Sequence, residues 1–221
     1  MAQQSLPGTD AARHGSGDAD LAVMIAAHDA FRRDLVSLAR AASRTRSADP
    51  VKRASISAGW EMFKTQLHLH HTSEDQLIWP NLAEKLSHSD AALSVLEAME
   101  VEHGHIDPLL AAVDRAFADP QSDRLADVTD ALASDLTAHL NHEERDALPL
   151  IGVALTTKEW KAVTVQIGKQ AGLSAGGAFF GWMLNNAPED SKRAVLGSVP
   201  PPVRLLYRAI WKPKYDKPPR W

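Results

Sequence analysis

Four segments of the chain carry apolar residues at steps of three and four, and each places a histidine within its apolar stripe. That spacing is typical of one face of an α-helix, and no segment alternates as a strand would. Short connections between the segments favour antiparallel neighbours. The chain is therefore predicted to be all-α, with an up-down-up-down four-helix bundle at its centre. The four histidines are His28, His70, His103 and His139.

Prolines and capping residues mark the ends of these helices. The first helix is expected from about Asp20 to Arg44, and Pro50 should begin the second. Ser89 is a good N-cap for the third helix. Pro108 lies within the third pattern and predicts a kink or a restart there, because proline lacks the N–H of a helix interior. Pro80 and Pro149 lie near the ends of the second and fourth helices.

Two of the four stripes add a glutamate four residues after the histidine, at Glu74 and Glu143. Residues four apart on a helix are neighbours on one face. An ionised carboxylate in an apolar core costs several kcal/mol unless it is paired. Two divalent cations would neutralise both acids and accept the imidazole lone pairs, and a carboxylate can bridge two metals. The pattern predicts a binuclear site for iron, manganese or zinc.

Composition narrows the chemistry further. The chain has no cysteine, which excludes thiolate zinc sites, iron–sulfur clusters and disulfides. Any metal must bind nitrogen and oxygen ligands. The formal net charge of −4 argues against nucleic acid as the main partner. The N-terminus lacks a signal-peptide pattern, so a cytoplasmic location is expected.

The segments His70-x-x-x-Glu74 and His139-x-x-x-Glu143 run into Leu-Ile-Trp-Pro80 and Ala-Leu-Pro149. They resemble those of the hemerythrin-like, or HHE cation-binding, proteins. The likeness covers about Leu21 to Ile151. It implies two iron ions bridged by carboxylates and by an oxo or hydroxo group, with Glu74 and Glu143 as the bridging residues. The iron ligands that it implies are His28, His70, Glu74, His103, His139 and Glu143.

Two positions depart from the oxygen-carrying hemerythrins that this chain resembles. Those carriers have a second histidine one turn after the helix-three histidine, where this chain has Asp107. They also place the helix-four carboxylate five residues after its histidine, which here is Glu144. Asp107 and Glu144 are therefore additional candidate ligands, and Glu143 is preferred over Glu144 because its spacing copies that of Glu74.

Several neighbours of the candidate ligands are assigned lesser roles. His71 and His142 are expected to support the ligands rather than bind metal, and His68 and His105 are expected to be exposed. Asp75 could orient a ligand histidine by accepting a hydrogen bond. Glu100 is expected to be a supporting or surface acid. Two tryptophans, Trp60 and Trp79, are expected to pack in the core.

The sequence is compatible with three classes of function: an enzyme, a reversible carrier or sensor, and a protein that stores iron or uses it structurally. A site open to dioxygen, peroxide or nitric oxide could turn these molecules over, as a catalase-like, peroxidase or nitric-oxide-consuming enzyme. Asp107 in place of a histidine favours such reactivity, because it leaves one iron more exchangeable. The alternatives are a reversible carrier or sensor of dioxygen or nitric oxide, and a protein that sequesters iron or uses the metal structurally.

The flanking segments are predicted separately. Residues 1–19 are small and polar and are expected to be a disordered tail before the bundle of residues 20–151. Residues 152–221 are expected to add helices, with a capping box from Thr156 to Glu159 and a break at Gly172–Gly177. No stretch is long enough to span a membrane. The last 22 residues carry a net charge of +5 against −9 elsewhere, which favours packing of this extension on its own domain; a dimer contact is the alternative.

Overall fold

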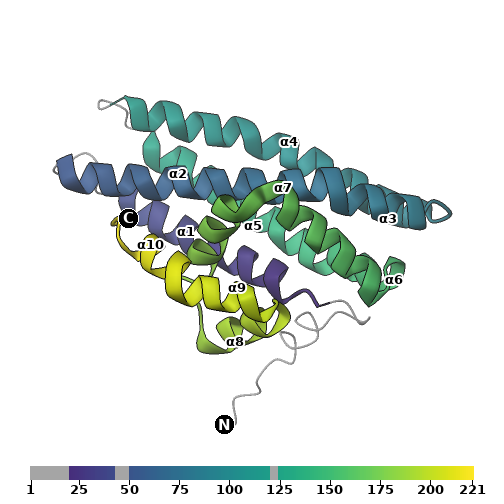
Figure 1. Cartoon of the computed structure of the whole chain (residues 1–221). Coiled ribbons are helices and arrows are strands. Elements are labelled where there is room, and N and C mark those ends of the chain that lie inside the picture. Colours follow the sequence, from purple (N-terminus) through teal and green to yellow (C-terminus); the bar gives the residue numbers. More distant parts are fainter. Residues whose placement is uncertain (1–19, 43–49, 120–123) are drawn as a thin grey trace, which may run out of the picture.

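The computed structural model describes residues 20–42, 50–119 and 124–221, and every regular element within them is a helix (Figure 1). Four long helices form the bundle that the sequence predicts. Helix α1 packs against both α2 and α5, and α4 packs against α5. Extra helices follow at the C-terminal end, as expected. The long helices are α1 (Ala22–Ala42), α2 (Pro50–Ser73), α4 (Asp90–Ala118) and α5 (Leu125–His142).

The predicted helix starts are confirmed in detail. Pro50 is the first residue of α2. The Ser89 side chain accepts a hydrogen bond from the Ala92 amide, which caps α4. Of the kink or restart predicted at Pro108, the restart is wrong, because α4 continues through this proline to Ala118. The expectation for residues 1–19 lies outside the described residues.

Helices α2 and α5 do not end at their prolines. Each passes through one π-helical turn, η2 (Glu74–Ile78) or η3 (Glu143–Ala147), and continues as α3 (Trp79–Lys85) or α6 (Leu148–Ala154). Proline has no N–H to donate and its ring collides with the carbonyl one turn earlier in an α-helix. A wider π turn relieves both problems, which explains why the helices continue beyond Pro80 and Pro149.

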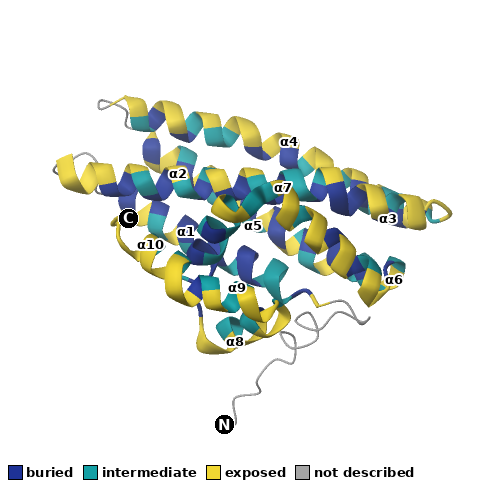
Figure 2. Cartoon of the chain, viewed as in Figure 1, coloured by how far each residue is buried: buried dark blue, intermediate teal, exposed yellow. Residues whose placement is uncertain are grey.

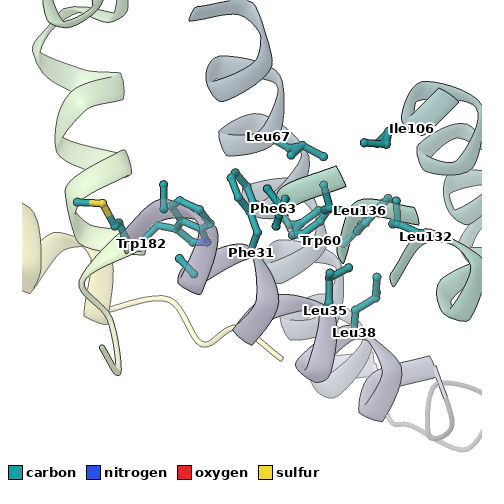
Figure 3. Packing of buried hydrophobic residues seen from close by; sticks show 14 of the residues in the cluster. Phe31, Leu35, Leu38, Trp60, Phe63, Leu67, Ile106, Leu132, Leu136 and Trp182 are labelled. Carbon is teal, nitrogen blue, oxygen red and sulfur yellow. The ribbon is translucent and has the colours of Figure 1, made fainter. Parts of the chain in front are cut away.

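Apolar side chains from all four long helices fill the interior (Figures 2 and 3). Trp60 and Trp79 are each 2% exposed, so the prediction that they pack in the core is confirmed. Phe31 on α1 contacts Phe63 on α2 edge to face, with ring centroids 5.8 Å apart. This core holds the helices around the predicted metal-binding residues, which lie nearer the α3–α6 end.

The C-terminal extension packs on its own bundle, which is one of the two arrangements expected. Helix α7 (Thr157–Met183) begins with the predicted capping box between Thr156 and Glu159. Gly172 interrupts it with φ of 74°, a conformation that favours glycine. Helices α7 and α8 (Glu189–Ser198) both contact α1. The chain then forms α9 (Pro201–Leu206), η4 (Tyr207–Trp211) and α10 (Lys212–Asp216).

Three aromatic residues of the basic tail lie directly on glycines. A Cβ atom at Gly177 would lie 2.6 Å from the Trp211 ring, and one at Gly181 would lie 2.7 Å from Tyr215. Trp221 lies equally close to Gly59 on α2. These glycines let the tail approach α7 and α2 more closely than any side chain would permit. In the described residues, no helix has the length and apolar character needed to cross a bilayer.

Candidate metal centre

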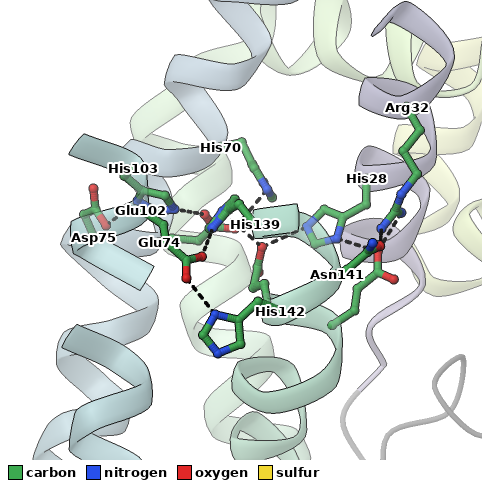
Figure 4. A network of polar contacts seen from close by, with 12 residues as sticks. His28, Arg32, His70, Glu74, Asp75, Glu102, His103, His139, Asn141 and His142 are labelled. Carbon is green, nitrogen blue, oxygen red and sulfur yellow. Dashed lines mark hydrogen bonds and ion pairs between the residues drawn. The ribbon is translucent and has the colours of Figure 1, made fainter. Parts of the chain in front are cut away.

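Seven side chains from α1, α2, η2, α4, α5 and η3 meet inside the bundle in two groups. Figure 4 labels five of them, His28, His70, Glu74, His103 and His139. Within each group the donor atoms all lie within 4.8 Å of one another, close enough for a shared ion. All six ligands implied by the family resemblance are included. The first group is His28, His70, Glu74 and Glu143; the second is His71, His103 and His139.

Both glutamates lie between the two groups. One Glu74 carboxylate oxygen is 3.1 Å from His70 Nε2, and the other is 3.5 Å from His103 Nε2. A single Glu143 oxygen lies 3.2 Å from His28 Nε2 and 3.8 Å from His139 Nε2. Each carboxylate can therefore reach a metal in either group, which is the position that a bridging ligand requires.

The donor atoms themselves fit a metal and little else. Five histidine Nε2 atoms and all four carboxylate oxygens of the two glutamates are buried without a hydrogen-bond partner. Buried polar atoms are almost always paired, and an unpaired one costs about 1–3 kcal/mol. Nine such atoms converging on one interior space would be strongly unfavourable unless cations bind there. Imidazole nitrogen with carboxylate oxygen is a donor set that suits iron, and also manganese and zinc.

Carboxylates behind the histidines fix the direction in which the rings face. His28 Nδ1 lies 2.8 Å from Glu144, His103 Nδ1 lies 2.9 Å from Asp75, and His139 Nδ1 lies 2.8 Å from Glu102. A histidine that donates through Nδ1 presents a bare Nε2 lone pair on its opposite side. The expectation that Asp75 accepts a hydrogen bond from a ligand histidine is confirmed, and Glu102 is a further orienting acid that the sequence analysis did not identify.

The two additional candidate ligands are not brought into either group. Asp107 is exposed on α4. Glu144 contacts the outer side of His28 and also accepts a hydrogen bond from Arg32 at 2.7 Å, so its carboxylate is already engaged. Glu100, His68 and His105 are exposed.

His71 is the donor that sequence reasoning missed. It was expected to support the ligands, but its Nε2 is one of the unpaired buried atoms and its ring stacks on His103 with centroids 3.8 Å apart. His70 faces the other way, with its ring 5.0 Å from that of His28. Adjacent helical residues diverge by about 100°, so the His70–His71 pair lets α2 contribute to both groups. The tandem histidine was the signal that could have indicated this.

His142 has the supporting role that was expected of it. Its Nδ1 lies 2.7 Å from the second oxygen of Glu102, so one carboxylate contacts both His139 and His142. This arrangement fixes Glu102 as well as the ring of His139. Figure 4 shows Glu102 between these two histidines.

Without a metal, burial disfavours the ionised forms of Glu74, His70 and His103, whereas the contact between His28 and Glu143 raises the pKa of His28 and lowers that of Glu143. Burial raises the pKa of Glu74 well above its ordinary value, and the nearby charge of Glu143 raises it further. Burial would lower the pKa of His28, but the Glu143 and Glu144 carboxylates raise it to about 9. Burial lowers the pKa of His103 to about 4 and that of His70 well below normal. Most of these imidazoles are thus neutral, which is the form that binds metal.

Comparison with known protein families gives a match that covers the bundle. The model of the family described as "Hemerythrin HHE cation binding domain" matches residues 11–151, well over half of the chain. Searches of curated proteins and of solved structures returned no significant match. The matched segment contains all seven donors and the orienting acids, and it ends before the C-terminal extension. This chain belongs to the hemerythrin HHE cation-binding family.

Proposed function

We propose that this chain is a non-heme di-iron protein that binds or reacts with dioxygen, peroxide or nitric oxide. The observation that carries the proposal is the set of nine buried donor atoms that have no hydrogen-bond partner. One iron would be held by His28 and His70, and the other by His71, His103 and His139. Glu74 and Glu143 would bridge them. A cytoplasmic location remains our expectation.

The residues present leave room for a small molecule. Iron ions with about six coordination positions each would not be saturated by nine donor atoms. Each iron would supply one-electron redox chemistry and a coordination position at which a diatomic molecule or peroxide can bind. The protein supplies orientation through Glu102, Asp75 and Glu144, and all seven donor side chains are buried.

Reversible carriage is the second candidate, and His71 favours it. Asp107 favours turnover only because it replaces a histidine that oxygen carriers have. His71 restores that fifth imidazole from a different helix. With five histidines, the donor set does not require an iron that has an exchangeable ligand in place of the missing histidine. The experiment below distinguishes a carrier from an enzyme.

The test uses full-length protein loaded anaerobically with ferrous iron, with metal-free protein as the control. Addition of dioxygen, hydrogen peroxide or nitric oxide should change the near-ultraviolet and visible spectrum in the loaded protein alone. Recovery of the starting spectrum when dioxygen is removed would identify a carrier. Irreversible oxidation with consumption of peroxide or nitric oxide would identify an enzyme. Tight iron binding with no response to any of the three would contradict the proposal and leave sequestration or a structural metal.

A further inference from the structure

A mostly apolar cavity of about 520 Å³ lies against the metal centre, between the bundle and the C-terminal extension. Its walls come from α1, from α2 and η2, and from α7 and the segment around Ser198–Val203. Figure 1 shows α7 lying across α2 and above the α8–α9 region. Two of the wall residues, His70 and Glu74, are donors of the metal centre.

The break in α7 shapes this cavity. Gly172 divides the helix, and both halves contribute wall residues, Trp160 and Ile167 before the break and Phe179 and Phe180 after it. The extension lies outside the segment matched by the family model, which ends at residue 151. One side of the cavity is therefore built by a part of the chain that the hemerythrin domain does not include, and the other side by α1, α2 and η2 of that domain.

The size of the cavity exceeds what a diatomic molecule needs. A water molecule takes about 30 Å³ of liquid volume, so the cavity has room for more than a dozen such molecules. Small organic ligands bind in pockets of about 300–1,000 Å³ that are mostly apolar with a few polar groups. The cavity falls in this range, and its character suits a hydrocarbon chain.

One cationic side chain is available on the wall. Lys161 is the only lysine or arginine among the described residues that line the cavity, and it makes no ion pair with any described residue. The acids there are engaged: Asp20 Oδ1 accepts a hydrogen bond from the Ala22 amide, and Glu74 belongs to the metal centre. Lys161 is exposed, so it can meet the charged end of a ligand at the mouth.

We propose that this cavity binds a medium-chain fatty acid, with its chain beside His70 and Glu74 and its carboxylate at Lys161. The inference deepens the proposed function, because it names an organic ligand held next to the irons. Only the presence of iron beside the ligand rests on the proposed function, since binding of the fatty acid in the cavity needs no metal.

The test is calorimetric titration of full-length protein, iron-loaded and metal-free, with decanoic acid as the probe. We expect one molecule per chain and a negative heat-capacity change, the mark of apolar burial. Gly176→Leu should weaken binding at least about tenfold, because a side chain at this wall position meets no atom within 4 Å and can extend into the cavity. The matched control is Gly197→Leu, at an equally open glycine that is not a wall residue.

The carboxylate contact is tested with a second, surface variant that spares the core. Lys161→Glu should weaken decanoic acid binding about tenfold while leaving the binding of decan-1-ol unchanged. Absence of saturable decanoic acid binding in the wild type would overturn the proposal, and so would equal affinity in Gly176→Leu and Gly197→Leu. Equal decanoic acid affinity in Lys161→Glu and wild type would overturn the assigned orientation. Decanoic acid binding by a protein that takes up no iron when iron is supplied would mean that the proposed function fails while this inference stands.

Discussion

His71 and His70 are consecutive residues that contact different halves of the metal centre. His71 stacks on His103 of α4, whereas His70 lies edge to face with His28 of α1. A helix that lies beside two donor groups can contribute to both of them, so His71, one position from the stripe, is a candidate ligand. The consequence is that His71 should be required for the second metal rather than for the fold.

Replacing His71 with alanine is therefore expected to lower iron content from about two per chain to about one. The physical reason is that the second group would keep only His103 and His139 of its own. His68→Ala is the matched control, on the same helix and exposed. Iron analysis after gel filtration, with circular dichroism to verify helicity, makes the measurement. Full iron content in His71→Ala would remove this residue from the ligand set.

Glu102 allows a second prediction at the residue scale. Glu102→Gln should weaken metal affinity about 10–100-fold, because an amide orients the His139 and His142 rings less firmly than a carboxylate. Glu100→Gln, an exposed acid two residues earlier on α4, is the control. Competition against a chelator of known affinity measures the change. An equal loss of metal affinity in both variants would mean that the change in net charge, rather than the orientation of the rings, weakens metal binding.

The sequence indicated six donors because each occupies the apolar stripe of its helix. His71 could not be assigned in the same way, since its position relative to the stripe predicts a supporting residue equally well. Glu102 and Glu144 depend on contacts between helices distant in sequence, which spacing along one helix does not reveal. Asp75 is the exception, because it follows a bridging glutamate and was expected to accept a histidine N–H.

At the scale of elements, the two π turns begin at the two glutamates that we propose as bridging ligands. Glu74 starts η2 and Glu143 starts η3, and each turn leads into a helix with proline in its second position. π-Helical turns are rare and often mark functional sites. The sequence indicated an end at each proline, but it could not indicate continuation, because that depends on the wider turn before it.

The glycine–aromatic contacts of α7 yield a stability prediction. Gly177→Ala should lower the free energy of unfolding by about 1–3 kcal/mol, since the new methyl group must displace the Trp211 ring. Gly176→Ala is the control one residue away. Its Cβ would meet nothing within 4 Å, so this variant should be neutral or more stable by about 0.5–1 kcal/mol. Urea unfolding measures both. Matching effects at the two positions would contradict the packing described for the tail.

At the scale of the whole molecule, the metal centre and the extension are coupled through α1. Trp182 of α7 donates a hydrogen bond to Asp34 at 2.8 Å and packs on Phe31, whose ring lies 5.2 Å from that of His70. The bundle and its helical class were predictable from periodicity. The placement of the extension was not, because it depends on aromatic residues meeting glycines far away in sequence.

Metal binding should stabilise the entire fold. The donors come from all four long helices, so the unfolded chain cannot reproduce the site, and binding to the native state alone adds stability by mass action. Removal of the metal with a chelator should therefore lower Tm, with a loss of about 4 kcal/mol if free metal was at 1,000 times Kd. Calorimetry before and after chelation, with metal restored as the control, tests this. An unchanged Tm would mean that the metal does not link the helices.

The most direct test of the central claim is the iron content of wild-type protein purified under iron-replete conditions, with an optical spectrum before and after reduction. The account predicts about two irons per chain, from the two donor groups, and near-ultraviolet absorption that bleaches on reduction. No iron, or one zinc ion per chain, would contradict the di-iron centre even if the helical bundle is correct.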